Sequence, residues 1–289
     1  MDDSQRIERR LASVVSEAGG AGCAPGLAAA VHHAVFPGGA RIRPHLCLAV
    51  ARACGGAASP GALAAATSIE LLHCASLVHD DLPCFDNAAT RRGVPSVHRA
   101  YGERLAVLAG DALIVLAFES MANERACPAD RRLALIGTLA RAAGMPYGIV
   151  AGQALECETE IVLSDYQQAK TGALFAAATV AGAQAVGADP GSWRAVGEYL
   201  GEAYQVADDI GDVNGNAEDL GKPTGRDAEL GRPNAVGHLG LVAASTRLQE
   251  LVSKARAAIP ECPGGEELRT RFLGFTQQLL QPRRARPAA

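Results

Sequence analysis

The stretch LLHCASLVHDDLPCFDNAATRRG, residues 71–93, is the most informative part of this chain. It is apolar up to Val78 and then becomes densely charged. Three carboxylates come first and two guanidiniums follow, and these charged residues are Asp80, Asp81, Asp86, Arg91 and Arg92. Crowded like charges destabilise a helix unless something positive lies among them, so the stretch predicts a bound cation or a charged ligand.

The composition of the chain favours helices. Of its 289 residues, 48% are hydrophobic and 4% are aromatic. Ala and Leu are frequent and cost least in a helix, whereas aromatic strand formers are scarce. The net charge of -4 excludes the broad positive field of a nucleic-acid-binding protein.

Helical periodicity recurs along the chain, and breaks rich in glycine and proline separate the periodic segments. We predict helices over residues 4–18, 25–35, 41–54, 60–82, 103–123, 130–143, 146–160, 164–185, 190–213, 234–258 and 265–280. No segment alternates as a strand does. No linker requires two domains, so we predict one all-α domain over residues 1–289, with a core at 25–260 and a basic tail at 281–289.

The eight cysteines form no CxxC pair, which suits the reduced thiols of a cytoplasmic protein better than disulfides or zinc. The first residues, MDDSQRIERRLASV, are charged, unlike a secretory signal. No run reaches the roughly 18 uncharged apolar residues of a membrane span. The nearest run, within 103–123, contains Asp111 and is predicted to be a buried core helix.

The first cluster predicts a helix that stops abruptly. Asp80 and His73 are seven residues apart and share a helix face. Pro83 disfavours helical geometry at Leu82, so the helix ends there. A turn at this point returns Asp86 towards Asp80, which a continuous helix does not do.

A second acidic cluster lies in YQVADDIGDVNG, residues 204–215. Asp208 and Asp212 lie one above the other on a helix face, and Gln205 is one turn before Asp208. A solvated acidic face is one explanation of such a cluster. Two clusters on apolar helices instead favour Mg²⁺, which binds one or two carboxylates together with phosphate oxygens.

Basic residues complete the inventory of a diphosphate site, because arginine binds phosphate through two hydrogen bonds and lysine acts as a compact charge. They are Arg41, Arg43, Arg91, Arg92, Lys170, Lys222, Arg226 and Arg232. The chain contains neither a P-loop nor GxGxxG, so metal and side chains rather than a glycine cradle are expected to hold the phosphates.

These motifs resemble the trans-isoprenyl (polyprenyl) diphosphate synthases over roughly residues 30–240. GGARIRP, HDDLPCFDN followed by RRG, GD, GQ, KTG, QVADDIGD and GKPTGRD occur in that family's order. The resemblance implies an all-α bundle of the isoprenoid synthase type around a central apolar cavity. It also implies a prenyltransferase that condenses isopentenyl diphosphate with an allylic diphosphate.

The resemblance gives each residue a role. Mg²⁺ is held by Asp80, Asp81, Asp86, Asp208, Asp209 and Asp212, which form the catalytic set with Lys170 and Lys222. The allylic diphosphate and its cation are bound by Arg91, Lys170, Thr171, Gln205 and Lys222, and isopentenyl diphosphate by Arg41, Arg43, His73 and Arg92. The departing diphosphate is the expected proton acceptor, and His79 is expected to be structural or to contact the metal ligands from behind.

Some positions depart from the family pattern. Ala40 stands where lysine is common, and a lost phosphate contact costs about 1–3 kcal/mol unless Arg41 or a neighbour substitutes. Ala88 and Ala89 replace acidic residues that usually lie outside the metal shell. Arg232 keeps the charge of the usual lysine.

Product length depends in this family on the helix before the first cluster. A bulky aromatic residue five positions before the motif stops the product at fifteen carbons, and Ala75 stands there. Ala75 and Ser76 are the predicted floor, and geranylgeranyl diphosphate is the predicted product. The motif wording most resembles bacterial enzymes of carotenoid or photosynthetic pigment pathways, and the family implies a homodimer.

Other interpretations remain open. They are farnesyl diphosphate synthase activity, a non-catalytic subunit of a heteromeric synthase, a terpene cyclase or head-to-head condensing enzyme, a metal phosphohydrolase of the HD type, and a helical bundle with solvated acidic patches. The intact aspartates oppose the subunit, and the other histidines do not cluster with His79 and Asp80 as an HD site requires.

Overall fold

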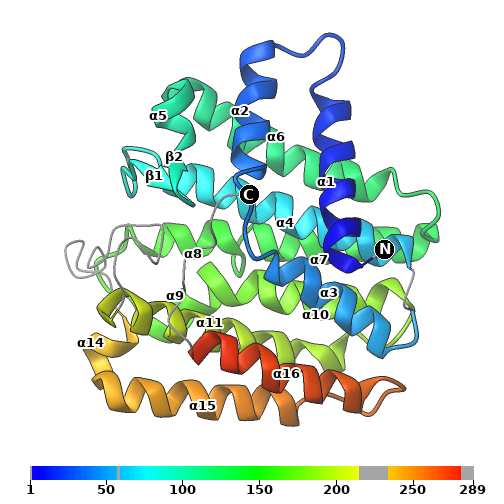
Figure 1. Ribbon diagram of the computed structural model, residues 1–289, viewed down its shortest axis with the longest axis vertical. Coiled ribbons are helices and arrows are strands. Elements are labelled where there is room, and N and C mark those ends of the chain that lie inside the picture. Colours follow the sequence, from blue (N-terminus) through cyan, green and yellow to red (C-terminus); the bar gives the residue numbers. More distant parts are fainter. Residues whose placement is uncertain (1, 57–58, 215–233, 281–289) are drawn as a thin grey trace. The chain divides into compact units, whose positions relative to one another are not determined.

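The computed structural model describes residues 2–56, 59–214 and 234–280 of the protein (Figure 1). Helices dominate, which confirms the all-α prediction. The chain divides into two compact units, and each is described by itself. Unit 1 comprises residues 1–140 and 181–188, and unit 2 comprises residues 141–180 and 189–289. The prediction of a single domain over the whole chain stays a prediction.

Unit 1 is built around α4. Its elements are α1 (Asp3–Ala18), α2 (Pro25–Val35), α3 (Ile42–Ala53), α4 (Pro60–Asp80), β1 (Thr90–Arg91), β2 (Val94–Pro95), α5 (Val97–Tyr101), α6 (Glu103–Ala122) and most of α7 (Ala129–Ala143). The Ser59 hydroxyl caps α4 by accepting from the Ala62 N–H at 3.2 Å, and Pro60 fits the first turn. Small buried side chains let α4 pack closely against α1, α3 and α6.

α6 is buried on one face only. Ala109, Leu113 and Ala117 are fully buried, at helical spacing. Leu108 and Val115 on the other face are 50% and 63% exposed. The prediction of a buried core helix at 103–123 is therefore correct for one face and wrong for the other. By length and hydropathy alone, α4 and α6 both reach the dimensions of a membrane span, and α4 is mostly buried inside the protein.

Unit 2 centres on α11. Its elements are the end of α7, α8 (Ile149–Leu155), α9 (Leu163–Gln167), the π-helix η1 (Gln168–Gly172), α10 (Ala173–Ala185, up to Val180), the 3-10 turn η2 (Gly191–Trp193), α11 (Arg194–Asn214), α14 (Ala235–Leu239), α15 (Leu241–Ala257) and α16 (Gly265–Leu280). Ala203 and Val206 of α11 pack in a common core with Leu248 and Leu251 of α15.

Three predicted helices of unit 2 differ in detail. The helix predicted over 146–160 forms only from Ile149 to Leu155. The helix predicted over 164–185 contains the wider π-helical turn of η1, a distortion frequent at functional sites. The helix predicted over 234–258 is interrupted at Gly240, whose φ of +80° suits glycine.

Candidate functional site

The chain folds back directly after α4. The N–H of Asp86 donates to the Asp80 carbonyl at 2.9 Å, and the N–H of Ala88 donates to the Asp81 carbonyl at 3.2 Å. The Ser96 hydroxyl closes the loop by donating to the Ala88 carbonyl at 2.7 Å. These bonds confirm the predicted return of Asp86 towards Asp80.

Asp81 is buried and bound by Arg91. Only 2% of Asp81 is exposed, and Nε of Arg91 donates to its Oδ1 and Oδ2 at 3.0 and 3.2 Å. Burial raises the pKa of Asp81, while the bonds from Arg91 oppose that rise. Burial acts to lower the pKa of Arg91, but Asp81, Asp80 and Asp86 together raise it. Arg91 therefore lies in the field of all three carboxylates of the first cluster.

A short hairpin presents the two arginines, and the sequence analysis did not predict it. Arg91 pairs with Val94 across the antiparallel strands β1 and β2. Arg92 and Gly93 form the turn with φ of +54° and +80°. Two-residue hairpin turns require this left-handed geometry, which arginine adopts with strain. Such strain is typical of functional sites.

Arg92 reaches the glycine loop that precedes α3. Its Nη1 donates to the Gly38 carbonyl. Gly39 has a φ of +143°, which strains any other residue, and a Cβ there would lie 2.8 Å from Cζ of Arg92 and displace that side chain. Ala40, the departure from the family pattern, follows in an exposed position.

Cations gather around His73. The pKa of His73 lies well below its ordinary 6.5, because the ring is buried and because it lies in the positive field of Arg43, Arg92, Arg91 and Arg41. Guanidinium groups are suited to binding anions such as phosphate. Unit 1 thus brings together every residue predicted for isopentenyl diphosphate.

Arg41 is committed to protein partners. It is 5% exposed, and its Nε donates to Glu8 at 2.7 Å and its Nη1 to Glu70 at 2.8 Å. Nη2 donates to the Val35 carbonyl at 2.8 Å. These contacts do not support direct phosphate binding by Arg41. Glu70, buried in α4, was missed by the sequence analysis, and the signal was a lone acid in an apolar run.

His79 packs between α4 and α6. A Cβ on Gly110 would lie 2.0 Å from Nε2 of His79, so the glycine of the GD motif makes room for the ring. Nε2 lies 3.3 Å from the Val107 carbonyl and 3.8 Å from Asp111. These contacts support the predicted structural role of His79.

Unit 2 brings the second cluster against η1. A Cβ on Gly201 would lie 2.6 Å from Cα of Gly172, so two glycines let α11 approach the π-helix. One turn later, Gln205 accepts a hydrogen bond from the Thr171 hydroxyl at 2.8 Å. The Gln205 amide donates to Asp209 at 2.8 Å.

Lys170 also has a protein partner. It forms an ion pair with Glu156, and the Tyr166 hydroxyl donates to the same carboxylate at 2.6 Å. A Cβ on Gly152 would lie 2.3 Å from the Lys170 N, which explains the glycine of the GQ motif. Glu156 was missed by the sequence analysis, which identified GQ without the acid that follows it.

Each acidic cluster has one buried and two half-buried members. Asp81 and Asp209 are both 2% exposed, whereas Asp80 and Asp86 of the first cluster, and Asp208 and Asp212 of the second, are half-buried. In the described part of the chain, no three acidic, His or Cys side chains are already arranged as a complete metal site. The carboxylate oxygens of the two clusters instead fit Mg²⁺, which completes its coordination with water and phosphate oxygens.

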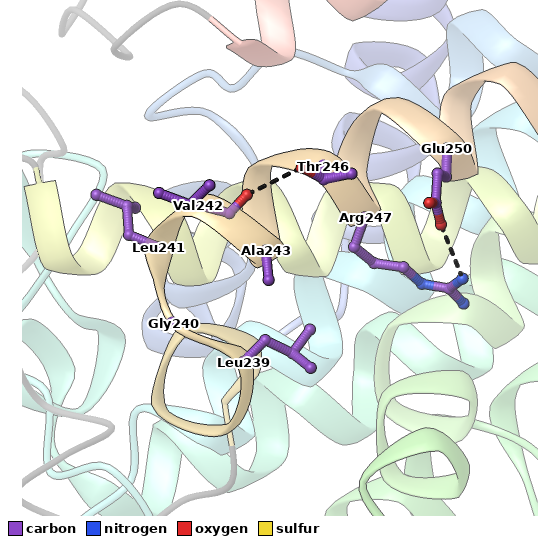
Figure 2. A pocket seen from close by; sticks show the side chains of 8 residues that line it. All are labelled: Leu239, Gly240, Leu241, Val242, Ala243, Thr246, Arg247 and Glu250. Carbon is purple, nitrogen blue, oxygen red and sulfur yellow. Dashed lines mark hydrogen bonds and ion pairs between the residues drawn. The ribbon is translucent and has the colours of Figure 1, made fainter.

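Two further predicted sets remain untested. Ala75 is 1% exposed, and the half-buried Ser76 donates to the His73 carbonyl at 2.9 Å, so both lie on α4 below Asp80. Lys222 lies outside the described residues. A depression over α14 and α15 contains none of the predicted site residues; Figure 2 shows Leu239, Leu241 and Val242 among the residues that line it.

Comparison with known proteins identifies chains that are similar over most of this one. A family model described as polyprenyl synthetase matches residues 24–262. A geranylgeranyl diphosphate synthase of Cereibacter sphaeroides is 52% identical over 276 residues, 96% of each chain. One of Rhodobacter capsulatus is 49% identical over 268 residues, 93% of each chain.

Solved structures share the fold. A geranyltransferase from Helicobacter pylori, complexed with magnesium and isoprenyl diphosphate, has a TM-score of 0.82 and 31% identity over 95% of this chain and 96% of its own. A geranyltranstransferase from Thermotoga maritima has a TM-score of 0.77 and 28% identity over 96% of this chain and 97% of its own.

Proposed function

Because the chain belongs to the polyprenyl synthetase family of prenyltransferases, we propose that it makes geranylgeranyl diphosphate from isopentenyl diphosphate and an allylic diphosphate. Membership confirms the resemblance stated from the motifs. The substrates, the Mg²⁺ requirement and the product length are the proposal, and the relatives named geranylgeranyl diphosphate synthase support it.

One observation in unit 1 carries the proposal. The fold-back after α4 gathers three carboxylates near Arg91, and His73, which lies on the same helix, is surrounded by arginines from α3, its N-cap and the hairpin. A metal-binding carboxylate set beside an excess of guanidinium charge suits two diphosphate groups. A solvated acidic surface, the alternative from sequence, does not bury Asp81 or surround His73 with arginines.

In the proposed reaction, the C–O bond of the allylic diphosphate breaks, and its electron pair leaves with the diphosphate. The double bond of isopentenyl diphosphate forms a C–C bond to the allylic cation, and a proton passes to the departing diphosphate. Mg²⁺, when bound, supplies positive charge for that leaving group. The ligands we assign to it are the aspartates of the two clusters.

The residues of the chain hold and orient these groups. Arg43, Arg92 and His73 bind isopentenyl diphosphate. Arg41, which donates a hydrogen bond to the buried Glu70, adds positive charge near His73. Lys170 supplies an ammonium to the allylic diphosphate, and Glu156 fixes its position beforehand. Fixed charges of this kind stabilise a developing anion because they need little reorganisation during the reaction.

The direct test supplies Mg²⁺, isopentenyl diphosphate and farnesyl diphosphate, and separates the products by carbon number. A twenty-carbon product supports the proposal, and a fifteen-carbon limit with shorter starters indicates farnesyl synthesis. Diphosphate release without isopentenyl incorporation indicates a cyclase or a hydrolase. No turnover by a folded protein indicates a partner subunit.

The same assay tests the predicted floor. Ala75→Tyr places an aromatic ring on α4 below the first cluster, and we expect it to shorten the product. Ala75→Ser is the matched control, since it adds little volume. An unchanged product profile in a folded Ala75→Tyr protein excludes Ala75 from the floor.

We also assign the protein to the cytoplasm and to a homodimer. Eight free thiols suit a reducing compartment. The exposed apolar face of α6, which includes Val107, Leu108 and Val115, is a surface that a second copy can cover. Light scattering then gives twice the chain mass of 29.7 kDa. We also propose that the enzyme supplies a pigment pathway, and this proposal rests only on the amino-acid sequence of the motifs.

A further inference from the structure

A continuous chain of hydrogen bonds joins η1, α11 and α14 in unit 2. Thr171 Oγ1 donates to Gln205 Oε1 at 2.8 Å, and Gln205 Nε2 donates to Asp209 Oδ1 at 2.8 Å. The N–H of Ala235 donates to Asp209 Oδ2 at 2.7 Å. Thr171 and Asp209 are 8% and 2% exposed, so little water competes for these bonds.

The chemistry of the groups gives this chain a direction. An ionised carboxylate only accepts hydrogen bonds, so Asp209 draws the NH₂ end of Gln205 towards itself. This turns Oε1 of Gln205 towards Thr171. Because a carbonyl oxygen also only accepts, the Thr171 hydroxyl must give its proton to Gln205. The two lone pairs of Thr171 Oγ1 are then the groups that face anything bound beside it.

We propose that Asp209 is a positioning residue that sets this direction, so that Thr171 presents lone pairs to the allylic cation. The inference rests on the proposed function, for which the family resemblance assigns Thr171 and Gln205 to the allylic diphosphate and its cation. It adds a positioning role to the predicted role of Asp209, because one of its oxygens accepts from Gln205 and the other from Ala235. An oxygen lone pair stabilises a nearby cation, whereas a hydroxyl hydrogen at the same place repels it.

Asp209→Asn reverses the direction. The Ala235 N–H needs an acceptor, so the Asn oxygen faces Ala235 and the Asn NH₂ faces Gln205. The Gln205 amide must then flip, offer its oxygen to position 209 and donate to Thr171. Thr171 now points its proton towards the cation. We expect kcat to fall about hundredfold, the lower end of the range seen when one oriented dipole is lost from a reaction site.

Exchanging the amide of position 205 and the carboxylate of position 209 restores the original direction of the hydrogen bonds. In the double variant Gln205→Glu with Asp209→Asn, the Asn oxygen accepts from Ala235 and its NH₂ donates to the new carboxylate. That carboxylate again accepts the proton of Thr171. Gln205→Glu alone puts two carboxylates in contact, so it is impaired like the other single variant. Net charge is unchanged in the double variant.

The test measures kcat, the KM of both substrates and the Mg²⁺ concentration for half-maximal rate in the four proteins. We expect both single variants to lose rate, the double variant to recover at least tenfold over Asp209→Asn, and the Mg²⁺ requirement to stay within about twofold. A metal ligand at position 209 gives the opposite result, a requirement raised about tenfold or more with no recovery, and this overturns the inference.

A second measurement needs no substrate. Thermal unfolding of the four proteins should show that each single variant loses stability and that the double variant regains most of it. Independent losses that simply add in the double variant also overturn the inference. If the unaltered protein makes no prenyl product, the proposed function fails, while the unfolding cycle still decides the direction of the chain.

Discussion

The two acidic clusters have the same pattern of burial, but different groups bind the buried aspartate in each. In each, the second aspartate of the DD pair is buried, Asp81 in unit 1 and Asp209 in unit 2. Arg91 binds Asp81 with a full charge, and the described bonds of Asp209 include a side-chain amide and a backbone N–H as donors. The other aspartates of each cluster stay half-buried and can reach a ligand.

The difference shows how each cluster is organised. Unit 1 gathers charge, because Arg91 and the arginines around His73 all act on their neighbours through space. In unit 2, Gln205 and Ala235 reach Asp209 through hydrogen bonds, which carry direction as well as attraction. We therefore expect the first cluster to respond to pH and charge changes, and the second to changes that alter donors and acceptors.

The largest expected effect tests whether the half-buried aspartates of both clusters bind the metal. Asp80→Asn and Asp208→Asn each remove one half-buried ligand charge, and we expect kcat to fall about 10³-fold because several kcal/mol of charge stabilisation are lost. Steady-state kinetics with a Mg²⁺ titration measures this. Asp130→Asn, an exposed aspartate on α7, is the control. Equal losses in all three variants would contradict the assignment.

A second change tests the charged anchor of Asp81. Arg91→Ala leaves a buried carboxylate without its cation, and we expect the free energy of unfolding to fall by about 3 kcal/mol at neutral pH. Because burial already raises the pKa of Asp81, this loss should shrink as pH falls through that pKa and the carboxyl becomes neutral. Denaturant unfolding at several pH values measures both effects.

The nearby Arg99 provides the control for that experiment. Arg99 is exposed and donates only a long 3.3 Å bond to Asn87, so Arg99→Ala should cost little at any pH. A loss in Arg91→Ala that does not change with pH would show that packing, and not charge, anchors the first cluster.

A third change adds a cation to unit 1. Ala40 is exposed beside the glycine loop that Arg92 reaches, so Ala40→Lys can restore the ammonium that the family commonly carries. We expect the KM for isopentenyl diphosphate to fall about tenfold, equivalent to one phosphate contact. Ala40→Gln has similar length without charge and should leave this KM almost unchanged. If both variants behave alike, the site does not use that charge.

The smallest effect concerns His73. Its pKa lies below 6.5 in the folded protein, so below pH 6.5 the unfolded chain binds the extra proton first. The free energy of unfolding therefore falls as pH drops through this range, by at most about 1.4 kcal/mol per pH unit. His73→Gln should flatten that slope, and His238→Gln, an exposed histidine in unit 2, should not.

Local signals in the sequence predicted much of this fold. Proline and glycine breaks gave most helix ends within a few residues, because they act on the backbone at their own positions. Pro83 alone implied that α4 stops and that Asp86 returns. The hairpin at Arg92 and Gly93 was missed, since two paired residues on each strand leave no alternating pattern.

Partners across the chain were harder to predict. Arg41 looked like a phosphate ligand, but Glu8 and Glu70 bind it from positions far away in sequence. Lys170 likewise meets Glu156 only because η1 packs on α8 at Gly152. Neither pairing follows from spacing along one helix, because each depends on how separate helices pack.

The sequence by itself determined the chemistry available to this protein: two acidic clusters, each at the end of an apolar helix, with guanidiniums close to the first in sequence. Only the tertiary structure decided which members of each set contact other protein groups and which remain accessible to a ligand. Whether an aspartate such as Asp81 or Asp209 faces the protein or a ligand depends on burial and on a partner brought from elsewhere in the fold. Burial is a property of packing, and the order of residues along one helix cannot encode it alone.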